Sequence, residues 1–185
     1  MSKIGCVIMA SGEGRRFGGN KLLAEFQGKT LIQRILDTTE GLFEKRVVVT
    51  RSEMVRDLCQ QQNVEVILHS MPNRNDTVRL GIEDMKDMDG CIFCPSDQPL
   101  LHRDSVKALL ESFEKKKMGI HRLVFEAREG TPILFGKEYF EELKNLPEKC
   151  GGSYVIKKYP QVVEKVSALY VRELMDVDTQ EDLEM

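Results

Sequence analysis

The sequence predicts a doubly wound α/β fold, a mainly parallel twisted sheet with helices on both faces, and three observations support this prediction. Short apolar runs rich in β-branched residues alternate with stretches of helical spacing. Crossover helices between such strands make the strands parallel and cover both faces of the sheet. The length of 185 residues suits one domain, and no repeat or linker divides the chain. Residues 1–185 are therefore expected to form a single domain.

Composition and charge narrow the classes of function. Hydrophobic residues make up 41% of the chain and charged residues 31%, which is typical of a folded domain. No apolar run approaches the roughly 20 residues that a membrane-spanning helix needs, so no membrane partner is expected. The formal net charge of −3 provides no general positive field for a nucleic-acid backbone, so no nucleic-acid partner is expected either. A small anion could still bind locally.

The expected elements follow in order along the chain. Strands are expected at 4–10, 46–50, 64–68, 90–94, 121–127, 131–135, 162–166 and 169–177. Helices are expected at 30–42, 52–62, 76–87, 103–117, 137–146 and 151–158. A last short helix starts at Asp178, which fits a capping box with Glu181. Ligands of such sheets bind beyond the carboxyl ends of the strands, which directs attention to the loops after residues 10, 68 and 95.

The first apolar run and the cysteines indicate in which cellular compartment the protein is expected. The run at 4–10 is short and closely followed by charge, so it is not a secretory signal, and a cytoplasmic location is expected. Five cysteines at irregular spacings indicate reduced thiols. Cys91 and Cys94 lie three apart on an expected strand, so their side chains point to opposite faces and are expected to be core thiols, not metal ligands. The histidines have no ligand spacing and are expected at surface or loop positions: His69, His102 and His121.

The loop after the first strand is rich in glycine and positive charge. Gly12, Gly14 and Gly18 alternate there with Arg16 and Lys21. Backbone N–H groups of such a loop can approach phosphate oxygens, while the two basic side chains supply positive charge. The spacing matches neither the dinucleotide fingerprint nor a complete Walker motif. The loop is therefore predicted to bind phosphate groups through a different pattern.

Two further segments belong to the same expected edge of the sheet. Arg74 stands just before a helix in which Thr77 could either cap the helix or contact a ligand. Asp97 follows the buried strand 90–94, and a hard carboxylate at that position suits Mg²⁺ bridging to phosphate oxygens. A turn aspartate between prolines is the alternative for Asp97.

A pair of aspartates near the C-terminus extends this acidic group. If a strand ends at Asp176 to Asp178, the two carboxylates share a face. One of them could then complete a metal site with Asp97. Asp178 has the helix-capping role as its alternative.

These motifs resemble, in order and spacing, those of MobA-like nucleotidyltransferases of the molybdenum cofactor cytidylyltransferase type. The matches run from residue 4 to residue 183 and include Gly-x-Gly-x-Arg-x-Gly-x-x-Lys at 12–21 and Asp-Gln-Pro-Leu at 97–100. The resemblance implies the Rossmann-like nucleotidyltransferase fold, which is GT-A-like. It also implies transfer of CMP from CTP to a phosphate of molybdopterin with release of pyrophosphate, and Mg²⁺ as the cofactor, with Mn²⁺ as an alternative. A molybdenum enzyme that receives the product is the implied protein partner.

The resemblance also implies roles for residues of this sequence. Catalysis is assigned to Arg16, Lys21 and Asp97, and metal binding to Asp97, Asp176 and Asp178. In-line attack at phosphorus needs positioning and charge neutralisation more than a nucleophilic side chain, which agrees with these residue types. The residues assigned to the nucleotide are Ala10, Ser11, Gly12, Gly14, Arg16, Gly18, Lys21, Arg74, Thr77 and Gly81.

Two departures from the family pattern concern the acceptor. Segment 148–153 lacks the aspartate and the arginine that family members often carry, and Thr131 replaces the histidine of a Gly-His-Pro segment. The acceptor therefore stays open between molybdopterin, a sugar phosphate and methylerythritol phosphate. A non-catalytic nucleotide-binding role in the maturation of a molybdenum enzyme is a further alternative.

Overall fold

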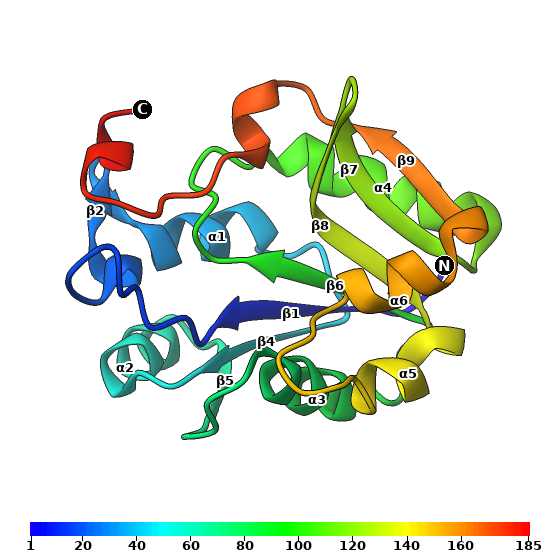
Figure 1. Cartoon of the computed structure of the whole chain (residues 1–185), viewed down its shortest axis with the longest axis horizontal. Helices are drawn as coiled ribbons and strands as arrows, with labels where there is room; N and C mark the ends of the chain where they lie inside the picture. The colour runs from blue at the N-terminus through cyan, green and yellow to red at the C-terminus, as the bar shows by residue number, and fades with distance from the viewer.

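A single seven-stranded sheet forms the centre of the molecule, and the computed structural model describes all of Met1–Met185 (Figure 1). The strand order is β5-β4-β1-β6-β8-β7-β9. The strands are β1 Ile4–Ala10, β4 Lys45–Thr50, β5 Glu65–Leu68, β6 Gly90–Pro95, β7 Ile120–Phe125, β8 Arg128–Gly136 and β9 Val163–Ser167. Only β8 runs antiparallel to its neighbours. The mainly parallel sheet confirms the predicted fold class.

Helices cover both faces of this sheet. They are α1 Leu31–Thr39, α2 Glu53–Gln61, α3 Arg74–Asp84, α4 Arg103–Lys116, α5 Phe140–Lys144 and α6 Ser153–Lys158. One core cluster of 22 buried residues joins α1, α2 and α4 to the sheet. A second cluster of 18 buried residues joins α3, α5 and α6 to the opposite face. Because both faces are covered, the central strands read as continuous apolar runs, and this made them recognisable in the sequence.

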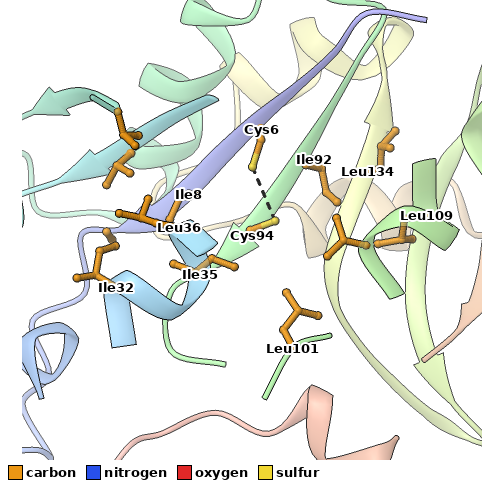
Figure 2. Close-up of a cluster of buried hydrophobic side chains, with 14 of the residues drawn as sticks. Cys6, Ile8, Ile32, Ile35, Leu36, Ile92, Cys94, Leu101, Leu109 and Leu134 are labelled. Carbon is orange, nitrogen blue, oxygen red and sulfur yellow. Dashed lines mark hydrogen bonds between the residues drawn. The ribbon is translucent and has the colours of Figure 1, made fainter. Parts of the chain in front are cut away.

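Cysteines contribute to the core on both faces of the sheet, and Figure 2 shows Cys6 and Cys94 among the buried side chains of the first cluster. Cys6 and Cys94 lie on adjacent strands with their sulfur atoms 3.9 Å apart, and both are free thiols. Cys91 is buried in the other cluster, on the opposite face of the sheet, as the strand geometry predicts. Burial raises the pKa of the Cys6 and Cys91 thiols well above the usual value, so these groups stay protonated.

Three local predictions are wrong. No strand spans 169–177, because β9 ends at Ser167 and a 3-10 helix at Val171–Leu174 follows. The buried carboxylate of Glu173 holds that turn, since it accepts hydrogen bonds from the backbone N–H groups of His102 and Tyr170, both at 2.9 Å. The sequence carries no signal for this distant contact.

The other two corrections concern the last turn and a histidine. Asp178 does not cap the C-terminal 3-10 helix at Glu181–Glu184, because the Asp182 carboxylate instead accepts from the N–H groups of residues 178 and 179 at 2.8 Å. His121 is fully buried rather than exposed, with its Nδ1 2.8 Å from Ser112 Oγ and its Nε2 3.0 Å from the carbonyl oxygen of Met118. These partners satisfy both ring nitrogens inside the core.

No helix of the structure combines the length and the apolar character that crossing a membrane would require.

A short hairpin of β2 Glu25–Phe26 and β3 Lys29–Thr30 leads into α1. Thr30 and Gln33 form a capping box there, which sets the start of the helix.

Candidate active site

A cavity of about 710 Å³ lies at the carboxyl ends of the parallel strands, where the loops after β1, β5 and β6 meet. It has two chemically different parts. The polar end is lined by residues of the glycine-rich loop and the acidic loop: Ser11, Gly12, Gly14, Arg16, Lys21, Asp97 and Asp178. The apolar end is lined by side chains from β6, β8 and α5 together with one arginine from β7: Phe93, Ile133, Phe135, Leu143 and Arg122.

The backbone of the glycine-rich loop turns sharply at Gly14. Its φ is +59°, and a Cβ atom there would lie 2.8 Å from the carbonyl oxygen of Gly19, so only glycine fits without strain. The N–H of Phe17 donates to the Gly14 carbonyl oxygen at 2.9 Å, and the Phe17 ring is buried beside Val177. The loop is thus anchored to the protein at its tip while Gly12 faces open space.

Lys21 is held in place by the 3-10 helix that begins with it. The side chain of Asn20 caps this helix by accepting from the N–H of Leu22 at 3.2 Å. The Lys21 ammonium donates to Asp97 Oδ2 at 2.8 Å and to the carbonyl oxygen of Val177 at 2.9 Å, and it lies 3.4 Å from Asp178 Oδ1. Its side chain is 12% exposed, so water screens these interactions only weakly.

Further charge surrounds this cluster. Arg16 Nη2 lies 3.1 Å from the other oxygen of Asp178. Asp176 accepts a hydrogen bond from Gln98 Nε2 at 2.9 Å. Loss of contact with water raises the pKa of Asp176, and the nearby Asp97 carboxylate adds to this shift. The structure therefore brings the three predicted aspartates together although the strand expected at 169–177 is absent.

The carboxylates suit a hard divalent cation, although no group of three or more His, Cys, Asp or Glu side chains could hold a metal ion by itself. Asp97 and Asp178 direct oxygen atoms at one ammonium group, which shows that a positive charge fits between them. Magnesium in nucleotide sites is usually bound by one or two carboxylates, and phosphate oxygens and water complete its shell. A pair of carboxylates beside the glycine-rich loop is thus a sufficient protein contribution to such a site.

The helix α3 places two of its predicted residues in the cavity. It begins at Arg74, two residues earlier than predicted, after Asn73, whose N–H donates to the Asp76 carboxylate at 3.2 Å. Thr77 therefore lies inside the helix, and its capping alternative is wrong. Arg74 and Thr77 both line the cavity.

Four other predicted residues do not line the cavity. Gly81 faces β1, where a Cβ atom would lie 2.6 Å from a methyl carbon of Val7, so the structure gives it a packing role. Ala10 is a buried residue of β1, whereas Gly18 is exposed at the tip of the loop with φ +80°. Asp176 is an exposed residue outside the cavity lining, where it contacts Gln98.

A contact between Ser11 and His69 was missed in the sequence. Ser11 Oγ donates to the carbonyl oxygen of Val49 at 3.1 Å and lies 2.8 Å from His69 Nε2. His69 Nδ1 accepts from the N–H of Met71 at 3.2 Å, so Nε2 carries the proton and donates to Ser11. Burial lowers the pKa of His69, and Arg51 lowers it further, which favours this neutral form. A lone histidine after a strand gives no sequence signal for a hydrogen bond to a serine in another loop.

The apolar end follows from the register of the sheet. Phe93 on β6 pairs with Ile133 on β8, and Ile133 pairs with Arg122 on β7. Directly paired residues point to the same face, so these side chains form one row across three strands. The Phe135 ring packs edge-on against Phe93 with centroids 5.9 Å apart. An apolar floor thus runs from the polar end to an arginine.

Comparison with known proteins agrees with this arrangement. The profile of the family described as "MobA-like NTP transferase domain" matches residues 6–163. A probable molybdenum cofactor guanylyltransferase of Aquifex aeolicus is 27% identical over 132 residues, which cover 67% of this chain and 64% of that protein. A protein of the same description from Methanosarcina mazei is 26% identical over 96% of this chain and 87% of its own length. The chain thus spans less than two thirds of the Aquifex relative.

Solved structures share the fold at low sequence identity. The protein Rv0371c of Mycobacterium tuberculosis H37Rv superposes with a TM-score of 0.86 at 20% identity, covering 99% of this chain and 97% of that one. Another structure of Rv0371c from this organism is a complex with manganese, with a TM-score of 0.78 at 18% identity and coverage of 99% and 97%. A CMP-2-keto-3-deoxy-manno-octonic acid synthetase complexed with CTP has a TM-score of 0.75 at 17% identity, covering 99% of this chain and 96% of that one.

Proposed function

This chain belongs to the MobA-like NTP transferase family, and we propose that it transfers a nucleoside monophosphate from an NTP to a phosphate of the molybdenum cofactor. The family makes it a nucleotidyltransferase. The observation that carries the proposal is the contact of Lys21 with Asp97 and Asp178 at the polar end of the cavity, beside the glycine-rich loop.

The polar end provides what this reaction needs. An oxygen of the acceptor phosphate forms a bond to the α-phosphorus, the bond from that phosphorus to the bridging oxygen breaks, and pyrophosphate leaves. In our proposal the N–H groups of the loop and the side chains of Arg16 and Lys21 neutralise the phosphate oxygens. Asp97 and Asp178 are the proposed ligands of Mg²⁺ or Mn²⁺, which supplies further positive charge to the phosphates when bound.

Arg74 and Thr77 are the proposed contacts to the nucleoside, because both line the cavity beside the loop. The sequence motifs favour CTP as the donor. The curated relatives, however, are named guanylyltransferases, and this does not support the cytidylyl type. We therefore rank GTP first and CTP second as the nucleotide to be tested.

The acceptor is proposed as molybdopterin from the names of the relatives. The apolar end agrees with an acceptor that has a ring system, as argued below, whereas a sugar phosphate would place polar hydroxyl groups on an apolar floor. A molybdenum enzyme remains the proposed recipient of the product.

Release of pyrophosphate tests the proposal. The full chain is incubated with each of the four NTPs, Mg²⁺ or Mn²⁺, and molybdopterin, glucose phosphate or methylerythritol phosphate. We expect release that requires molybdopterin and is fastest with GTP, or with CTP if the sequence motifs rather than the relatives identify the base. Release that depends on another acceptor, or no release in any combination, would contradict the proposed function.

A further inference from the structure

Arg122 occupies an unusual position for an arginine. Its side chain is 14% exposed, yet it lines the cavity at the end of the row formed by Phe93 and Ile133. Arginine is rarely buried unless its charge is compensated. The partners of the guanidinium group therefore indicate what this residue does.

The protein satisfies only part of this guanidinium. Nη1 donates to Glu129 Oε2 at 2.9 Å, and Nη2 donates to the carbonyl oxygen of Gly130 at 3.2 Å. Nε is buried and has no hydrogen-bond partner in the protein. A buried charged group with one donor unpaired keeps part of its desolvation cost uncompensated, so a negatively charged ligand at the exposed part of this guanidinium would gain affinity.

The charge near Arg122 is also unbalanced. Glu129 is shared with Lys165 on β9, whose Nζ lies 3.2 Å from Glu129 Oε1. Its hydrogen bond to Lys165 lowers the pKa of Glu129, and the charge of Arg122 adds to this effect. Two cations thus face one carboxylate, and the excess positive charge lies at the cavity wall.

The floor beside Arg122 favours a flat partner. Phe93 and Phe135 pack edge to face, and Ile133 stands between Phe93 and Arg122 in the row. Planar rings bury much area against such side chains at small entropic cost. A ligand of this end therefore combines an apolar ring with negative charge.

We propose that Arg122 is a specificity-determining residue, which binds a negatively charged group on a flat ring system of the acceptor, apart from the phosphate that reacts. This inference rests on the proposed function, because the ring belongs to the acceptor of that reaction. It extends the proposal by naming the residue that distinguishes an anionic ring acceptor from a sugar phosphate.

Binding of simple pterins tests the inference without turnover. The fluorescence of a carboxypterin and of its uncharged hydroxymethyl analogue is titrated with the full chain, in the absence of nucleotide. We expect the carboxypterin to bind at least about tenfold more tightly, as a charge-assisted hydrogen bond predicts. Glucose phosphate is expected to displace it only at much higher concentration.

Three variants test whether the preference for the carboxypterin over its uncharged analogue depends on Arg122. Arg122→Gln should abolish this preference while leaving the affinity for GTP or CTP within about twofold of the wild type. Arg122→Lys keeps the charge but loses the planar guanidinium group, and should retain only part of the preference. Lys107→Gln is the control, because Lys107 is an exposed cation on α4, outside the cavity, that does not contact Glu129.

Several results would overturn the inference. These are equal binding of the two pterins by the wild type, an unchanged preference in Arg122→Gln, or displacement by glucose phosphate at equal concentration. If Arg122→Gln does not fold, Arg122→Lys decides the question. An unchanged preference of this variant for the carboxypterin would also overturn the inference. Failure of the proposed function is separate, because absent pyrophosphate release would leave an Arg122-dependent pterin preference intact.

Discussion

The two ends of the cavity are built in different ways. The polar end comes mainly from contiguous segments, since 11–16 and 95–97 each contribute several neighbouring residues. The apolar end is assembled from single residues on β6, β8, β7 and α5. Binding phosphate through backbone amides needs neighbouring residues in a fixed local conformation, whereas an apolar floor needs only the right face of each strand. Consequently the first end has a sequence motif and the second has none.

The largest expected effect comes from removing the cation of the polar end. Lys21→Ala should lower turnover by about 100- to 1,000-fold, the usual loss when a preorganised charge at a reacting group is removed. Steady-state pyrophosphate release measures this, and a melting curve reports whether the variant stays folded. Lys29→Ala is the control, because Lys29 is exposed on β3 and lies outside the cavity. Turnover near the wild-type level in Lys21→Ala would remove the polar end from the mechanism.

The two C-terminal aspartates should differ in their effect on metal use. Asp178 lines the cavity and contacts Lys21, whereas Asp176 is exposed outside the cavity lining and contacts Gln98. Asp178→Asn should raise the Mg²⁺ concentration for half-maximal turnover by on the order of 10-fold, and Asp176→Asn by less. A Mg²⁺ titration of turnover measures both variants. The reverse order would identify Asp176 as the ligand.

Gly81→Ala separates folding from binding. The new methyl group would overlap with Val7, and this overpacking outweighs the better helix propensity of alanine, so we expect a net loss of about 1 to 2 kcal/mol of unfolding free energy. Urea unfolding measures this loss. Nucleotide affinity of the folded protein should stay unchanged. If affinity falls while stability does not, Gly81 belongs to the site as the sequence motif suggested.

The smallest effect on the site is expected from His121, the neighbour of Arg122 that points to the opposite face of β7. Burial lowers the pKa of His121 in the folded protein, so below the ordinary value of 6.5 the unfolded chain binds more protons. Stability is therefore complete above pH 6.5 and falls as the pH drops towards the lowered value, by at most about 1.4 kcal/mol per pH unit for this group. His69 adds a similar effect.

Urea unfolding between pH 8 and pH 5 tests this dependence. His121→Gln should flatten it, while the pterin preference of the apolar end stays as in the wild type. An unchanged slope in the variant would assign the pH dependence to other groups. A lost pterin preference would show that the two faces of β7 are coupled.

Particular residues show how far the sequence could be interpreted. The segments at β1, β4 and β6 were predicted to within a residue or so, because strands buried on both faces are continuous apolar runs. The approach of Asp178 to Asp97 was predicted for a reason that proved wrong, since no strand leads to Asp178. The contacts of His69, Glu173 and His121 join residues from separate loops and elements, and such pairs leave no periodic signal in the chain.

By itself the sequence determined the alternation of strands and helices and the glycine-rich, basic character of the first loop, because both depend on residues that are close along the chain. The tertiary structure alone decided that Gly81 packs against the sheet and that Lys21 lies between two carboxylates. It also decided that Arg122 ends a row of apolar side chains with one donor unpaired. Those features depend on the register of the strands and on burial, which arise only when distant segments pack together.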